Sequence, residues 1–241
     1  MEISKENLEN IITQSNNFTN NSSQSIWDQS KAIDKYFGFH ISKIEQKLLK
    51  KYRAYYKTSD QSNRKQHFGE SETWIGLHPQ VLLTPYTEIY EFLNLLKKYN
   101  PKKIVDFGAA YGRVGIVMNS IYQDASFTGY EIIQQRVDEA NRIFEKFNFK
   151  NCEMIKENIL DENFNLPDAD IYFIYDFSNP IDISRLLNKL SDIIFKKRFF
   201  IVAKGEGIKS LIQLKYPQFW ASHGVIHKKH WSIYSSFCDL I

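Results

Sequence analysis

The chain has 241 residues, of which 43% are hydrophobic, and a formal net charge of +3. This length suits one large α/β domain with an appended segment, which buries roughly 70% or more of its unfolded surface. No apolar run approaches the roughly 18 residues of a membrane-spanning helix, the start is too polar for a signal peptide, and no Cys/His cluster has metal-ligand spacing.

Two cysteines complete the compositional picture. Cys152 and Cys238 fall on or beside different predicted strands. We therefore expect a cytoplasmic protein in a reducing compartment, with neither a disulfide framework nor a metal site.

The N-terminal quarter of the chain predicts a tail and a helical extension. Residues 1–25 are mostly polar and rich in Asn and Ser, so we expect a mobile tail. Residues 26–66 predict two helices, one over 27–37 and a second in which Ser42 and Glu45 have capping-box spacing. The second helix has one apolar stripe and too few neighbours for its own core, so we expect it to pack on the main domain.

Positive charge concentrates in this extension. Residues 43–65 contain eight basic and two acidic residues, a charge of +6 that leaves −3 for the rest of the chain. Such a segment suits an acidic protein surface or a nucleic acid. A solvated, lysine-rich helix face explains the same composition, and the sequence leaves the alternatives open.

Residues 67–100 predict a lid loop and a lead-in helix. The loop looks irregular and contains three ring side chains: Phe68, Trp74 and His78. These rings either anchor the loop to the core or cover a ligand as a lid. Thr84 and Pro85 are typical of an N-cap and a first helical position, and the helix should continue to Lys98.

From residue 101 onward, strands and helices alternate. Apolar segments predict five strands, over residues 103–107, 126–130, 151–155, 171–175 and 199–202. Two further segments, 219–226 and 230–237, are separated by only a few residues and suit an antiparallel pair. Residues 101–241 therefore predict one α/β domain with a mainly parallel sheet.

The turn after the first of these strands carries the most informative motif. Asp106 is followed by Gly108, Ala110 and Gly112 at alternate positions, just before a helix. Small residues allow backbone amides to approach a ligand closely at the start of a helix. The dinucleotide fingerprint would need glycine at Ala110 and a small residue at Arg113, so a nicotinamide cofactor is disfavoured.

This turn resembles motif I of the class I S-adenosylmethionine (SAM)-dependent methyltransferases, with alanine in place of the middle glycine. The order of elements over about residues 101–241 resembles the same family. The resemblance implies a Rossmann-like α/β fold whose seven-stranded sheet has the order 3-2-1-4-5-7-6, with strand 7 antiparallel. It also implies SAM-dependent methyltransferase activity, with SAM as the cofactor.

The resemblance also implies which residues bind SAM. The turn at residues 106–112 would contact the methionine and ribose portions, with Asp106 orienting both the turn and the ligand's amino group. Glu131 would accept hydrogen bonds from the two ribose hydroxyls, and the amide oxygen of Asn158 would accept one from the adenine amine. A surface glutamate that opens a helix and a turn asparagine are the structural alternatives.

The end of the fourth strand is where the family has its methyl-transfer site. Tyr175 and Asp176 are therefore the predicted catalytic residues, although Asp176 is also placed to cap the next helix. Ile181 and Asp182 replace the second proline and the aromatic residue of the nucleic-acid amino-methyltransferase motif, which disfavours base methylation.

Short segments at residues 112–117, 129–131 and 84–85 resemble the seven-strand protein-lysine methyltransferases. This resemblance gives Thr84 a place in the cofactor pocket and implies a protein lysine as the acceptor, in an apolar channel that keeps the amine neutral. The aromatic residues expected along that channel are Tyr86, Tyr111, Tyr175 and Phe177. A small-molecule O- or N-methyltransferase closed by residues 67–86 is the alternative enzyme, and a SAM-binding domain without catalysis is the non-enzyme alternative.

Overall fold

The structure is a computed structural model that describes residues 25–56, 66–68, 71–72, 74–75, 78–122 and 124–240. The predicted tail therefore lies outside the described residues, apart from Ser25, which accepts a bond from the Asp28 amide and caps the first helix. The part of the basic segment beyond residue 56 lies outside them as well.

Seven strands form one sheet in the order β5-β4-β3-β6-β7-β9-β8. The strands are β3 (Lys103–Phe107), β4 (Ser126–Glu131), β5 (Cys152–Lys156), β6 (Ile171–Tyr175), β7 (Phe200–Lys204), β8 (Val225–His227) and β9 (Trp231–Ser235). The first five are parallel, whereas β9 runs antiparallel to both β7 and β8. Counted from β3, this is the predicted order 3-2-1-4-5-7-6, and the prediction is confirmed.

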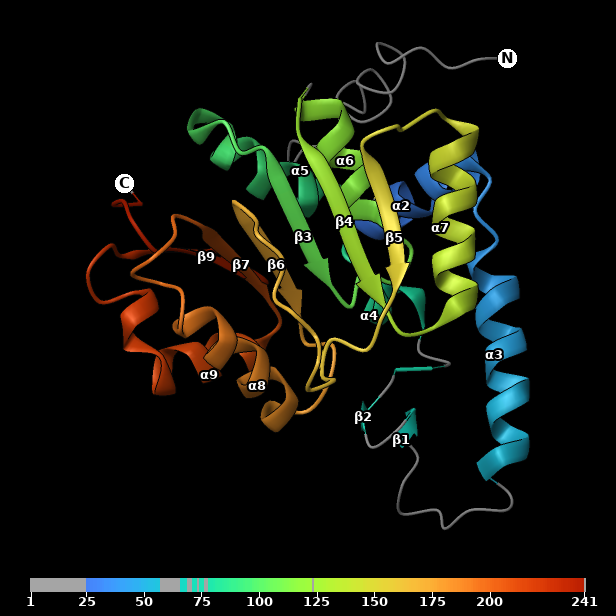
Figure 1. The fold of residues 1–241 in the computed structure, drawn as a ribbon. Helices are drawn as coiled ribbons and strands as arrows, with labels where there is room; N and C mark the ends of the chain where they lie inside the picture. The colour runs from blue at the N-terminus through green and yellow to red at the C-terminus, as the bar shows by residue number, and fades with distance from the viewer. Residues whose placement is uncertain are drawn as a thin grey trace.

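Helices cover both faces of the sheet, as Figure 1 shows. On one face lie α2 (Ile26–Phe37), α5 (Tyr86–Leu96), α6 (Arg113–Ile121) and α7 (Gln134–Lys146); on the other lie α8 (Pro180–Ser191) and α9 (Glu206–Lys215). Successive side chains of a strand point to opposite faces of the sheet. Ile104 therefore packs in the core under α2, α5, α6 and α7, and Val105 in the core under α8 and α9. Burial on both faces explains why the central strands are almost wholly apolar.

Several local predictions differ from the structure. Helix α5 begins at Tyr86, and Pro85 is its N-cap because its backbone is still extended, so the prediction of Thr84 as the cap is wrong. The irregular loop contains two short strands, β1 (Gln66–Phe68) and β2 (Ser71–Glu72), and a four-residue helix, α4 (Pro79–Leu82). A short 3-10 helix over Lys97–Tyr99 follows α5. Another over Pro217–Phe219 occupies the start of the segment predicted as a strand, so β8 is shorter than predicted.

Helix α3 (Ile41–Tyr56) packs on the main domain, as predicted. Ile41 lies in a cluster with Ala110 and Tyr111, and Leu48 packs against Ile133. The predicted capping box is wrong, because Glu45 is buried and its carboxylate bonds to Tyr111 instead of returning to the helix start. The extension therefore reaches the turn that follows β3.

Helix α2 is joined to the same region by a buried ion pair. Arg113, the first residue of α6, donates from Nε to Oδ1 of Asp34 at 3.2 Å and from Nη2 to Oδ2 of the same carboxylate. Its Nη1 donates to the carbonyl of Thr84 at 2.8 Å, and the Tyr86 hydroxyl donates to Asp34 at 3.0 Å. This network ties α2, α5 and α6 together.

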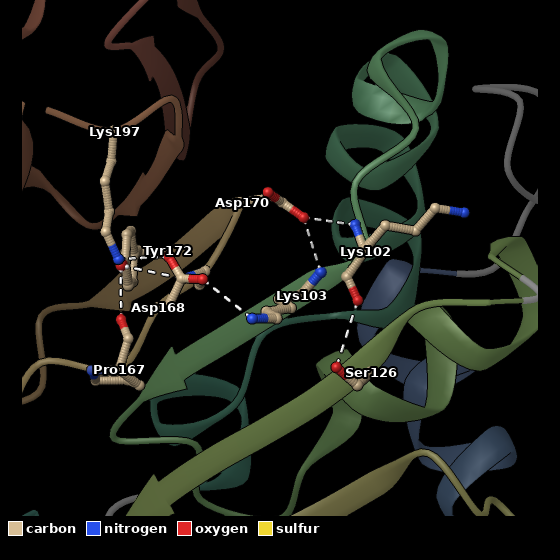
Figure 2. A network of polar contacts seen from close by, with 9 residues as sticks. Lys102, Lys103, Ser126, Pro167, Asp168, Asp170, Tyr172 and Lys197 are labelled. Carbon is tan, nitrogen blue, oxygen red and sulfur yellow. Dashed lines mark hydrogen bonds and ion pairs between the residues drawn. The ribbon is translucent and has the colours of Figure 1, made fainter.

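The amino ends of the strands carry a polar network of their own. Figure 2 shows Asp168 between Lys103 and Lys197, with Nζ–Oδ distances of 3.0 and 2.5 Å. The backbone amides of Lys102 and Lys103 donate to Asp170 at 2.6 and 2.9 Å. Hydrogen bonds from Lys197 and then Lys103 hold the pKa of Asp168 below its usual value. The network joins the loop before β6 to the start of β3, at the edge opposite the cavity described next.

Candidate functional site

A cavity of about 380 Å³ opens at the carboxyl ends of the parallel strands. Its walls come from the residues that follow β3, β4, β5 and β6, together with α4 and Trp74. From β3 the chain adds β4 and β5 on one side and then β6 and β7 on the other, so the direction of strand addition reverses beside β3. Open α/β sheets bind ligands in the crevice at such a switch point. Figure 1 shows α4 beside the tips of these strands.

The turn after β3 brings backbone close to this cavity. Gly108 and Gly112 have φ values of 79° and 69°, which glycine adopts without strain. A Cβ on Gly108 would lie 2.7 Å from Cβ of Phe177, so a larger residue does not fit. Ala110, which replaces the family's middle glycine, also has a positive φ of 47°. The turn needs small residues at these positions, as predicted.

Glu131 ends β4 and holds this turn. Its Oε2 accepts from the Ala110 amide at 3.1 Å and its Oε1 from the Ile133 amide at 2.9 Å. The residue is only 5% exposed and lines the cavity. A carboxylate can accept about four hydrogen bonds, so these two amides leave room for two ligand hydroxyls. The structural alternative for Glu131, a surface glutamate, is wrong.

Asp106 has a different environment from the one predicted. It is 4% exposed, does not line the cavity, and accepts no hydrogen bond from any described residue. Burial, and next the charge of Glu131, hold the pKa of Asp106 well above its usual range. Glu131 orients the turn, so that part of the prediction for Asp106 is wrong.

Asn158 lines the cavity after β5. Its Oδ1 accepts from the Leu160 amide at 3.1 Å, which is the turn geometry that the alternative described. An amide oxygen has a second lone pair and the NH₂ group donates twice. The turn bond therefore presents Asn158 to the cavity and leaves its remaining hydrogen-bonding groups available there.

Like Asp106 and Gly112, three further predicted residues do not line the cavity. Thr84 is buried behind it, where its carbonyl accepts from Arg113. Tyr86 and Tyr111 are fully buried, and their hydroxyls donate to Asp34 and Glu45 on the N-terminal helices. The predicted aromatic channel is therefore wrong for both tyrosines, because α2 and α3 cover them.

Tyr175 and Phe177 do line the cavity. The Tyr175 hydroxyl donates to the Val81 carbonyl of α4 at 3.0 Å, and its ring lies 5.3 Å from Nζ of Lys204. Lys204 is itself buried in an ion pair with Glu88. One face of the tyrosine ring therefore already contacts a cation.

Asp176 also lines the cavity, and it caps a helix, although not the next one. Its carboxylate accepts from the amides of Gly207 at 2.9 Å and Ile208 at 2.6 Å, at the start of α9. Asn179 caps α8 instead. Burial raises the pKa of Asp176, against the opposing effect of the two α9 amides. The carboxyl group is thus held rigidly with a raised proton affinity.

Asp176→Ala should lower the free energy of unfolding by about 0.5–2 kcal/mol, because it removes the N-cap acceptor of α9. Urea denaturation followed by circular dichroism measures the loss. Glu206→Gln, an exposed change in the first turn of α9, is the control and should leave the midpoint nearly unchanged. Equal midpoints for wild type and Asp176→Ala would contradict the capping role.

Trp74 crosses the cavity from one side to the other. Its indole Nε1 donates to the Asp176 carbonyl at 3.1 Å, while its own carbonyl accepts from Nη2 of Arg136 at 2.6 Å. It is thus anchored and also lines the cavity, whereas the role of the loop as a lid stays a prediction. His78 instead caps α4, accepting from the Gln80 amide at 3.3 Å. The side chain of Phe68 lies outside the described residues.

Arg136 and Glu45 are site residues that the sequence analysis missed. Arg136 lines the cavity, and its Nε donates to Glu45 at 2.9 Å across 91 residues of sequence. Arg136 belongs to no motif, Glu45 was assigned to a capping box, and charged residues in helices are ordinarily solvated. The only available signal was the position of Glu45 beside the apolar stripe of its helix.

Neither a membrane-spanning helix nor a cluster of metal-ligating side chains is present in the described part of the chain. There, no helix is both long and apolar enough to cross a membrane. Among those same residues, no group of three or more His, Cys, Asp and Glu side chains could hold a metal ion.

Comparison with known proteins gives a result at the level of structure. No protein-family model and no curated protein sequence matches the chain. The SAH-bound methyltransferase PaMTH1 of Podospora anserina superposes with a TM-score of 0.51 at 10% sequence identity, over 65% of this chain and 80% of that one. A cofactor-bound protein from MTB gives 0.50 at 11% identity, over 64% and 80%.

Likeness at such low identity is informative about architecture. It agrees with the strand order and the antiparallel β9. The chain has the seven-strand, Rossmann-like fold of the class I SAM-dependent methyltransferases.

Proposed function

We propose that this protein is a SAM-dependent methyltransferase. The observation that carries the proposal is the position of Glu131: a buried carboxylate at the end of β4, with lone pairs to spare, beside the turn after β3. Acidic residues at this point of Rossmann-like folds bind ribose hydroxyls. SAM and its product SAH contain that ribose, and the fold is the one in which this cofactor is used.

Each residue of the site has a proposed task. SAM, when bound, supplies a methyl group activated on a sulfonium. Glu131 accepts hydrogen bonds from the ribose hydroxyls, and Asn158 accepts one from the adenine amine. The turn over residues 106–112 lies against the methionine portion, with Asp106 as acceptor for its amino group. Tyr175 and Asp176 align the acceptor, since displacement needs alignment and desolvation above all, and the Asp176 carboxylate receives the released proton.

A lysine side chain of another protein is the acceptor that we propose first. Trp74, Tyr175 and Phe177 line the cavity near Asp176, and aromatic faces attract an amine in its cationic form. An apolar environment also favours the neutral amine, which is the form that attacks. The raised pKa of Asp176 suits it to take up the released proton.

A small molecule is the second candidate acceptor, with oxygen or nitrogen as the attacking atom. The position of Trp74 favours this candidate, because its two hydrogen bonds attach it to both α7 and the end of β6 beside the cavity. A bulky side chain held in the wall of the cavity narrows the space for the acceptor, which suits a small molecule better than the surface of a folded protein. Binding of SAM without catalysis is the remaining alternative.

The exposed lysines of α3 bear on the protein-acceptor proposal. Lys43, Lys47 and Lys50 project from α3, whose opposite side is buried. They would attract an acidic protein surface or a nucleic-acid-associated substrate, with association weakening as salt increases. Both cysteines are free thiols, which agrees with the proposed cytoplasmic location.

Titration with SAM and SAH tests the cofactor assignment. Wild type should bind both, and Glu131→Ala should weaken binding by about 1–3 kcal/mol through loss of charged hydrogen bonds to the ribose. Isothermal calorimetry measures this difference. Glu153→Ala, an exposed change on β5, is the control and should leave affinity unchanged. Absence of heat with SAM, together with tight binding of NAD, would overturn the proposal.

Incubation with labelled SAM and cell extract tests the acceptor. The label should appear in protein and be recovered as methyl-lysine after hydrolysis, and Asp176→Asn should reduce it because the proton acceptor is lost. Tyr175→Phe should reduce it less, because only the hydroxyl bond to Val81 is removed. Label confined to the small-molecule fraction, and abolished there by either variant, would replace the lysine proposal with the second candidate.

A further inference from the structure

The ribose-binding carboxylate proposed above is connected to the N-terminal extension through one buried arginine. Arg136 lies in the first turn of α7 and is 3% exposed. Its Nη1 lies 3.6 Å from Oε2 of Glu131, an ion-pair distance rather than a hydrogen bond. On its other side, Nε and Nη2 donate to the two carboxylate oxygens of Glu45 at 2.9 and 3.2 Å.

The same arginine and Glu45 also hold the two neighbouring segments of the site. Nη2 of Arg136 donates to the Trp74 carbonyl at 2.6 Å, which places the residue that crosses the cavity. Glu45 accepts from the Tyr111 hydroxyl at 2.8 Å, and Tyr111 belongs to the turn after β3. Glu45 thus contacts the turn and the arginine at once, although it does not line the cavity.

These charges depend on one another because they are buried. Glu45, Glu131 and Arg136 are each at most 6% exposed, so one guanidinium serves two carboxylates away from water. Removing one member leaves another without its partner in a medium where charges interact strongly. The Ala110 and Ile133 amides hold the Glu131 carboxylate, and Arg136 supplies its nearby positive charge. Glu45 in turn holds the Arg136 guanidinium through two hydrogen bonds.

We propose that Arg136 and Glu45 are positioning residues for Glu131, which makes helix α3 part of the cofactor site and couples its docking to cofactor binding. This inference rests on the proposed function, since it assumes that Glu131 binds the ribose. Binding of SAM or SAH to Glu131 should accordingly stabilise the docked position of α3. Conversely, loosening α3 should weaken binding, because coupling between two sites is reciprocal.

Two variants and one matched control test this coupling in the full chain. Glu45→Gln removes the charge at nearly constant shape and keeps an oxygen for Tyr111, whereas Arg136→Lys keeps the charge but loses the planar fork. Arg142→Lys is the control: it lies on the same helix and bonds to the Gly38 carbonyl at 2.7 Å and to Glu139 at 2.8 Å. Arg142 thus also holds the N-terminal segment, but it does not line the cavity.

Calorimetry with SAH gives the first readout. Glu45→Gln should weaken SAH binding about tenfold, the loss of roughly one charged hydrogen bond, while Arg142→Lys should change it less than about twofold. Combining Glu45→Gln with Glu131→Gln should cost less than the sum of the two single losses, because both act through one group. A merely structural role for Glu45 would lower the melting temperature and leave the two losses additive.

Hydrogen exchange gives the second readout, at the amides of residues 41–51. SAH should slow their exchange in wild type and in Arg142→Lys, but not in Glu45→Gln or Arg136→Lys. SAH affinity within about twofold of wild type in a folded Glu45→Gln variant, or additive losses in the double variant, would overturn the coupling and leave the proposed function intact. Failure of wild type to bind either SAM or SAH would overturn both.

Discussion

Asp34→Ala should lower the free energy of unfolding by about 3–5 kcal/mol, because it leaves the buried Arg113 guanidinium without its counter-ion. Arg113 is 5% exposed, and it has the Asp34 carboxylate on one side and the Thr84 carbonyl on the other. The same substitution removes the acceptor of the Tyr86 hydroxyl. Helix α2 would thereby lose its polar attachment to both α5 and α6.

Denaturation in urea measures this loss, with Asp28→Ala as the matched control. Asp28 lies on the same helix but its side chain is 54% exposed, in an i,i+3 pair with Lys31 at 3.6 Å. The control should leave the unfolding midpoint nearly unchanged, since exposed pairs contribute little. Equal midpoints for the two variants would show that the buried pair does not stabilise the docking of α2.

Asp106→Asn should raise the free energy of unfolding at pH 7 by about 1–3 kcal/mol, an effect opposite in sign to that of most core substitutions. Burial, and next Glu131, hold the pKa of Asp106 well above its usual range. The folded state therefore binds this proton more tightly than the unfolded chain, in which the pKa of Asp is about 3.9.

The sign of the pH dependence follows from this difference. The contribution of Asp106 is most favourable below the unfolded pKa, and it declines as pH rises from there toward the folded pKa. Asparagine resembles the protonated acid and does not titrate, so its advantage should be present at pH 7 and absent near pH 3. Denaturation curves at both pH values measure it. The control is Asp124→Asn, at an exposed position whose carboxylate lies 3.8 Å from Nζ of Lys102.

The same substitution separates stability from function. If Asp106 accepts a bond from the amino group of SAM, then Asp106→Asn should bind SAM more weakly while folding more stably. Retaining a destabilising carboxyl group is expected where binding needs it. If Asp106→Asn gained no stability at pH 7, a polar partner of Asp106 would have to offset the free-energy cost of burying its carboxylate. If its affinity for SAM were unchanged, Asp106 would not be a cofactor-binding residue.

The fold followed from local patterns to an unusual degree. Each parallel strand was visible as a short apolar segment, and the closing pair β8 and β9 was visible from the few residues between them. The turn at residues 106–112 could be identified from its small residues. The positive φ values and the close approach of Phe177 to Gly108 explain why small residues occur there. Such steric demands act over a few residues, so they leave a trace in the sequence.

The strand ends were equally local. Glu131 and Asn158 were placed at the cavity because parallel strands bring their carboxyl ends to one edge, whatever the details of packing. The loop with β1, β2 and α4 was not predicted, since strands of two and three residues have no detectable period. The start of α5 was predicted one residue too early, because only the backbone angles show that Pro85, and not Thr84, is the N-cap.

By itself, then, the sequence determined the order of the elements and the turn after β3, and the family resemblance of that turn implied the sheet topology and the role of the acidic residue beside it. The tertiary structure decided which charged side chains meet: Glu45 with Arg136, Asp34 with Arg113, and Asp176 with α9 rather than α8. It also decided that Tyr86 and Tyr111 lie under the N-terminal helices and away from the cavity. The physical reason is that periodicity indicates which side of a helix is buried, whereas the partner of a buried charge depends on how helices distant in sequence dock.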